Sequence, residues 1–171
     1  GRIVESQPKR GDIAVFRQPN KTSITFIKRI VGLPGDQIQV KGGILHIDGK
    51  AVERQKVGEG KVTDDTSKAF YNVYKETLPG GQTHLIQEMT DQGSLDNTVL
   101  FNVLPGHYFM MGDNRDNSRD SRTSAVGMVP AQNLIGKAQR LFYSHNSSAR
   151  IWEIWKWPFA IRYWRLGDSI I

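Results

Sequence analysis

Residues 26–36 read Phe-Ile-Lys-Arg-Ile-Val-Gly-Leu-Pro-Gly-Asp, a run that passes from strand-forming residues to turn-forming ones. The aromatic and β-branched residues predict a strand over Ile24–Val31. Leu33-Pro34-Gly35-Asp36 predicts a turn directly after it. Because neighbouring side chains of a strand point to opposite faces, Lys28 can face an apolar cleft while Arg29 points away toward a carboxylate.

Short strands separated by turn residues are predicted on both sides of this run. Asp48-Gly49 is a strong signal for a type I′ hairpin turn, because both of its central residues need positive φ. Leu134–Tyr143 has the composition of a strand and could also form a helix. The other predicted strands are Ile13–Phe16, a meander through Ile38 and Val40, then Ile44–Ile47, Ala51-Val52, Thr98–Val103 and Tyr108–Met111.

Residues 53–97 are polar and weakly patterned, which indicates an insertion or a second lobe. Two strands are predicted within this region, Tyr71–Glu76 and Thr83–Met89. Asp64-Asp65 and Pro79-Gly80-Gly81 interrupt it. The sequence as a whole therefore predicts a mostly β fold.

The composition allows one domain, or one domain with an insertion, in 171 residues of which 38% are hydrophobic. The absence of cysteine excludes disulfides, a thiol nucleophile and thiolate metal ligands. No apolar run approaches the roughly 20 residues that span a bilayer, and no targeting segment opens the chain. A net charge of +6 and a pI near 9.7 suit an anionic partner, and both nucleic acid and anionic lipid qualify.

The last 21 residues, 151–171, hold all four tryptophans of the chain among basic side chains. Aromatic rings with a polar edge prefer the headgroup zone of a membrane, and cationic side chains there are attracted to anionic lipid. The alternative is a tail that packs on the domain's own surface.

Residues 111–122 read Met-Gly-Asp-Asn-Arg-Asp-Asn-Ser-Arg-Asp-Ser-Arg and are dense in oxygen-bearing side chains. They could form a polar surface loop held by its own turn hydrogen bonds. A calcium loop of the EF-hand type is excluded, because its sixth and twelfth positions, counted from Asp116, hold Ser121 and Gly127 instead of Gly and Glu. Three arginines would also repel the ion, so no metal is expected.

These two runs, together with Arg10-Gly11-Asp12-Ile13-Ala14-Val15-Phe16, closely resemble three conserved boxes of the type I signal peptidases, in the family's order. The resemblance implies a signal-peptidase-like β core over residues 1–36 and 105–150. It implies a variable β insertion over 37–104. Residues 151–171 would be the aromatic, basic tail.

The resemblance also assigns roles to single residues. It implies that Lys28 is the general base and that the Ser118 hydroxyl orients it. A lysine can act as a base near neutral pH only if burial lowers its pKa, so Lys28 is expected to be largely buried and within hydrogen-bond reach, or one water, of Ser118. No cofactor and no histidine is required. The residues that would brace the site are Arg29, Asp113, Asp120 and Arg122.

The family's nucleophile lies in a box with serine followed by methionine, upstream of the Arg-Gly-Asp box, and that box is not in this sequence. The family's membrane-spanning segment is missing as well. We therefore expect the parent protein to remove signal peptides, with small residues before the cut, on the outer face of the bacterial cytoplasmic membrane. The 171-residue chain alone is expected to be inactive.

Three alternatives remain open at this point. A non-catalytic module of the same fold could bind preproteins or partner chains without cutting them. A basic nucleic-acid-binding protein is supported by pI and aromatic content alone, so no nucleic acid is expected as partner. A self-cleaving repressor also uses serine and lysine, but the Gly-Asp-Asn-Arg box fits it poorly.

Overall fold

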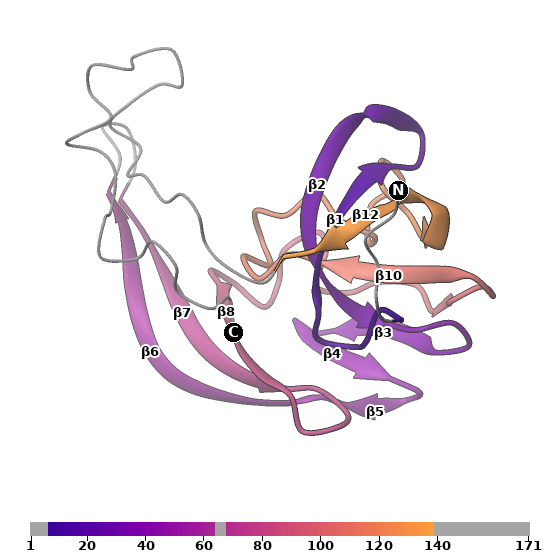
Figure 1. The fold of residues 1–171 in the computed structure, drawn as a ribbon. Helices are drawn as coiled ribbons and strands as arrows, with labels where there is room; N and C mark the ends of the chain where they lie inside the picture. Colours follow the sequence, from indigo (N-terminus) through magenta and orange to yellow (C-terminus); the bar gives the residue numbers. More distant parts are fainter. Residues whose placement is uncertain (1–6, 64–67, 139–171) are drawn as a thin grey trace, which may run out of the picture. The chain divides into compact units, whose positions relative to one another are not determined.

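The computed structural model describes residues 7–63 and 68–138. Their strands form three sheets, in which all neighbouring strands are antiparallel (Figure 1). The one helix among these residues is a 3₁₀ turn, η1 (Ala131–Asn133). The mostly β fold predicted from the sequence is confirmed.

The five-stranded sheet has the order β11-β10-β2-β1-β12, so β2 lies at its centre. Several of its buried side chains, among them Phe16, Ile30 and Met110, belong to one hydrophobic cluster. Burying each such side chain contributes about 1.5–3 kcal/mol. The strands are β1 (Ile13–Gln18), β2 (Lys21–Gly32), β10 (His107–Met111), β11 (Val129–Pro130) and β12 (Leu134–Lys137).

The two halves of β2 differ in burial. Residues 21–25 are exposed, whereas Arg29, Ile30 and Val31 are buried. Lys28 lies at the boundary between the halves and is itself half-buried. Lys28 therefore lies between the exposed half of β2 and the half that packs into the hydrophobic core.

The four-stranded sheet has the order β5-β4-β3-β9 and covers a second hydrophobic cluster, which includes Ile38 and Leu45. Asp48 and Gly49 have φ values of 52° and 76° between two paired strands, so the predicted type I′ turn is confirmed. The strands are β3 (Gln37–Lys41), β4 (Ile44–Ile47), β5 (Lys50–Ala51) and β9 (Phe101–Asn102).

The three-stranded sheet has the order β6-β7-β8, with β6 (Glu53–Thr63), β7 (Lys68–Thr77) and β8 (Thr83–Glu88). The sequence predicted the last two strands and missed β6. Pairing with β7 along its whole length, rather than alternating apolar residues, holds β6 in place. Of the predicted strand Thr98–Val103, only Phe101–Asn102 forms a strand, β9. Thr98 contacts β3 differently, because the Val40 amide donates to the Thr98 hydroxyl and not to a backbone carbonyl.

Strands from residues 1–36 and 105–138 form the five-stranded sheet, and strands from 37–104 form the other two. The division into core and insertion stays a prediction. The strand predicted over Leu134–Tyr143 is present as β12, and residues 139–143 lie outside the described residues, as does the tail at 151–171. In the described part of the chain, no helix is long and apolar enough to cross a membrane.

Candidate active site around Lys28 and Ser118

Lys28 and Ser118 are brought together by the pairing of β2 with β10. Met111, the last residue of β10, is opposite Arg29, so the chain that continues at Gly112 lies beside Lys28. A Cβ atom on Gly112 would clash with Ser118 Oγ and would lie 3.4 Å from Lys28 Nζ. The glycine thus leaves room for an amine and a hydroxyl to approach the same point.

The hydroxyl of Ser118 is buried, with 7% of the residue exposed, and Oγ makes no hydrogen bond to any described residue. The structure therefore shows no direct hydrogen bond to Lys28, and contact through one water stays a prediction. Lys28 is less buried than predicted, because the exposed half of β2 begins next to it. Its Nζ lies 5.8 Å from the centre of the Phe26 ring.

Arg29, the neighbour of Lys28 on β2, makes hydrogen bonds to the segments around Gly11 and Asp113. Its Nε and Nη2 donate to Asp113 Oδ1 and Oδ2 at 2.9 and 2.8 Å, and its Nη1 donates to the Gly11 carbonyl at 2.8 Å. Two parallel bonds fix the carboxylate in the plane of the guanidinium. The structure thus brings Arg29 and Asp113 together.

Asp120 and Arg122 form a second bidentate pair, which is almost fully buried. Arg122 donates from Nε and Nη2 to the two Asp120 oxygens at 2.9 and 2.8 Å. Asp120 Oδ2 also accepts a hydrogen bond from the Gly112 amide at 3.0 Å. Since Lys28 Nζ and Ser118 Oγ both lie close to Gly112, this carboxylate holds the backbone next to the two side chains.

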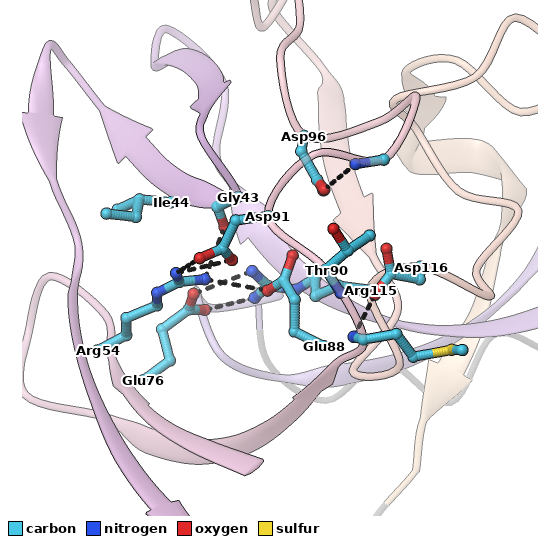
Figure 2. A network of polar contacts seen from close by, with 12 residues as sticks. Gly43, Ile44, Arg54, Glu76, Glu88, Thr90, Asp91, Asp96, Arg115 and Asp116 are labelled. Atoms are coloured by element: carbon cyan, nitrogen blue, oxygen red, sulfur yellow. Dashed lines mark hydrogen bonds and ion pairs between the residues drawn. The ribbon is translucent and has the colours of Figure 1, made fainter. Parts of the chain in front are cut away.

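Arg115 belongs to the same segment, but sequence reasoning gave it no role. It is 2% exposed and donates to Glu76 of β7 from Nη1 and Nη2 at 3.0 and 2.5 Å. Figure 2 shows the two side chains facing each other. His84 Nε2 lies 3.2 Å from the same carboxylate. Burial alone would raise the pKa of Glu76, but the Arg115 guanidinium, with His84, lowers that pKa to about 2.

Three carboxyl groups close to this pair could hold a cation. Glu88, Asp96 and Asp116 each offer one oxygen, and these oxygens lie within 4.8 Å of one another (Figure 2). Burial, with the charges of Asp96 and Asp116, raises the pKa of Glu88 to about 8 against the opposing effect of Arg115 and Arg54. A proton on Glu88 thus removes one negative charge at neutral pH, and the absence of a metal stays a prediction.

Comparisons with known proteins point to one family. The family model described as "Signal peptidase, peptidase S26" matches residues 2–143. The proteins named signal peptidase I of Rickettsia typhi and Rickettsia prowazekii are each 43% identical over 150 residues, which is 84% of this chain and 55% of each relative. The chain therefore spans about half the length of the curated relatives it matches.

Among solved structures, a signal peptidase I from Enterococcus faecalis matches with a TM-score of 0.45 and 23% sequence identity. The match covers 78% of this chain and 97% of that chain.

Proposed function

Because the chain belongs to the signal peptidase family, peptidase S26, we propose that it is part of an endopeptidase that removes signal peptides from exported preproteins. The observation that carries this proposal is that Lys28 Nζ and Ser118 Oγ both lie close to Gly112, and that Ser118 Oγ is buried with no hydrogen-bond partner among the described residues. An amine and a hydroxyl in this arrangement suit base catalysis without histidine.

In the proposed mechanism, the neutral amine of Lys28 takes the proton of a serine hydroxyl, and the serine oxygen attacks the scissile carbonyl. The tetrahedral intermediate collapses to an acyl-enzyme as the protonated amine returns its proton to the leaving nitrogen. Water then attacks the ester by the reverse roles. Ser118 Oγ can accept a hydrogen bond from the amine and so hold its direction.

The nucleophile is proposed to come from a part of the parent protein outside these 171 residues. None of the serines in this chain is followed by methionine, which is the context that the family's nucleophile has. The chain alone is therefore proposed to be inactive, since the base alone cannot form an acyl-enzyme.

The proposed substrates carry small residues before the scissile bond, as signal-peptide cleavage sites do. We place the reaction at the outer face of the bacterial cytoplasmic membrane, where such substrates emerge. The aromatic and basic residues at 151–171 support contact with an anionic membrane surface rather than with nucleic acid.

Cleavage of a preprotein with an Ala-x-Ala site tests the catalytic proposal. We compare the 171-residue chain with a version extended upstream through its serine box, and with Lys28→Ala and Ser118→Ala in the extended version. Only the extended chain should cut fully, Lys28→Ala should abolish cutting and Ser118→Ala should weaken it. Lys21→Ala, at the exposed end of the same strand, is the matched control and should cut at full rate.

Full activity of the extended Lys28→Ala variant would contradict the lysine mechanism. Cutting by the short chain would show that one of its own serines is the nucleophile. Tight binding of the preprotein by the extended chain without any cutting would favour the non-catalytic module.

Co-sedimentation with vesicles tests the membrane proposal separately. The chain should sediment with vesicles rich in anionic lipid, and removal of residues 151–171 should release it. Equal sedimentation of full and trimmed chains would remove the tail from the proposal.

A further inference from the structure

The segment Gly112–Arg122, which carries Ser118, is attached to the edge of β8. The Gln87 amide donates to the Asp113 carbonyl at 2.8 Å, and the Arg115 amide donates back to the Gln87 carbonyl at 2.9 Å. These two bonds make a parallel bridge around Asn114. The three-stranded sheet is therefore in direct contact with the segment that forms one side of the candidate site.

The Arg115 side chain extends this attachment to the next strand, β7. Arg115 and Glu76 are 2% and 1% exposed, and two hydrogen bonds join them. Removing two charges from water costs several kcal/mol, so a buried pair is weak evidence for a contribution to stability. Its planar, bidentate geometry does fix the position of the main chain at Arg115.

From Arg115 a series of contacts leads back to the site. The Arg115 carbonyl accepts a hydrogen bond from Arg122 Nη2 at 2.6 Å. Arg122 in turn holds Asp120, which accepts the Gly112 amide at 3.0 Å. Ser118 Oγ and Lys28 Nζ both lie close to Gly112.

We propose that Arg115 and Glu76 are positioning residues, which hold Ser118 Oγ against Lys28 by anchoring Gly112–Arg122 to the three-stranded sheet. The inference rests on the proposed function, because a position matters here only through proton transfer at Lys28. A misplacement of about 1 Å at a reacting group can cost about 100-fold in rate. Three-stranded-sheet residues would thus set the rate of a reaction whose groups lie on the five-stranded sheet and the segment after it.

Two substitutions of Glu76 in the extended enzyme test the proposal. Glu76→Asp keeps the charge but withdraws the carboxylate by one methylene, and Glu76→Gln keeps the size but removes the charge. We expect kcat per folded molecule to fall about 10- to 100-fold with KM within about twofold, and more strongly for Gln than for Asp. Glu59→Gln, which removes an exposed ion pair on β6 of the same sheet, is the control and should leave kcat unchanged.

A purely structural role predicts a different result. In that case the variants would lower the folded fraction while kcat per folded molecule stayed at the control value. Such a result, in either folded variant, would overturn the proposal.

A second measurement keeps the proposal testable if the extended enzyme cuts no signal peptide, which would defeat the proposed function alone. In the 171-residue chain, NMR cross-peaks between the Lys28 Hε and Ser118 Hβ protons report the placement of the two groups directly. Glu76→Asp should weaken these cross-peaks and shift the Gly112 amide signal, and Glu59→Gln should do neither. Unchanged cross-peaks in a folded Glu76→Asp chain would contradict the positioning role.

Discussion

Charged side chains of Gly112–Arg122 and the Ser118 hydroxyl of the candidate site lie on the same segment but differ in their hydrogen bonding. Asp120, Arg122 and Arg115 are buried, and each has bidentate partners. Ser118 Oγ is as deeply buried and has no hydrogen-bond partner among the described residues. The segment is thus fixed by its charges, while its hydroxyl is left free toward Lys28.

This difference indicates that the bidentate charged pairs stabilise the segment, whereas the Ser118 hydroxyl serves its chemistry. A buried hydroxyl without a partner costs about 1–3 kcal/mol, which a fold tolerates when neighbouring contacts fix the structure. The bidentate pairs supply those contacts. Substitutions on the two sides of the comparison should therefore have very different effects on the free energy of unfolding.

Breaking the Asp120 pair should have the largest effect. Asp120→Asn leaves the Arg122 guanidinium buried without a countercharge, which typically costs about 3–5 kcal/mol. Urea unfolding of the variant should show this loss. Glu59→Gln, which removes an exposed pair, should show no measurable change, and a similar loss in both variants would contradict the distinction between buried and exposed pairs.

Glu88 should make the unfolding free energy depend on pH. Its pKa is about 8 in the folded protein against an ordinary value of 4.5, so the folded state keeps a proton that the unfolded chain loses. This contribution is full below about pH 4.5 and falls as the pH rises toward about 8, by at most about 1.4 kcal/mol per pH unit.

Glu88→Gln has no titrating group at position 88. In urea unfolding between pH 5 and pH 8, its unfolding free energy should therefore change less with pH than that of the unsubstituted chain. Asp91→Asn is the matched control, because Arg54 donates hydrogen bonds to both Glu88 and Asp91, and Asp91 is exposed. The steep profile should persist in that control. An equally steep profile in Glu88→Gln would assign the proton to another group.

Gly112→Ala should disturb the point where the two sides of the comparison meet. The added Cβ would overlap Ser118 Oγ and lie 2.6 Å from Ser118 Cβ, which should cost about 1–3 kcal/mol. The Cβ of Gly136→Ala on β12 would meet no described residue within 4 Å, so this variant serves as the control in the same urea measurement. Equal stability of the two variants would show that the site has room to spare.

Ser118→Ala should have the smallest effect on stability, within about 1 kcal/mol and favourable in sign, because it removes a buried hydroxyl that has no hydrogen-bond partner in the described part of the chain. Ser121→Ala gives the contrast. The Ser121 hydroxyl accepts a hydrogen bond from the buried Met110 amide at 2.9 Å, and its loss should cost about 1–3 kcal/mol. A large loss in Ser118→Ala would show that its hydroxyl has a partner in solution.

The sequence predicted most strands of the five-stranded and four-stranded sheets, because alternating Ile and Val side chains and strong turn residues are local signals. The resemblance pointed to Lys28 and Ser118, and the structure places them at one glycine. Arg115 stood in the same box, but nothing local identifies Glu76 as its partner, since 39 positions separate them. Only the pairing of β7 with β8, and of β8 with the segment, brings these two together.

The polar residues of β6, which hid this strand from the sequence prediction, affect how the edge of its sheet can interact with other molecules. Among residues 7–63 and 68–138, β6 is the outer strand of its sheet and pairs only with β7, which leaves a row of backbone donors and acceptors that these residues do not pair and that a second molecule could use. Charged side chains interrupted by Gly58 and Gly60, and a register shift between Lys56 and Gly58, make that margin irregular and hydrophilic. Such a strand resists edge-to-edge association between copies of the protein, so replacing Lys56, Glu59 and Lys61 with valine should promote aggregation without altering the sheet itself.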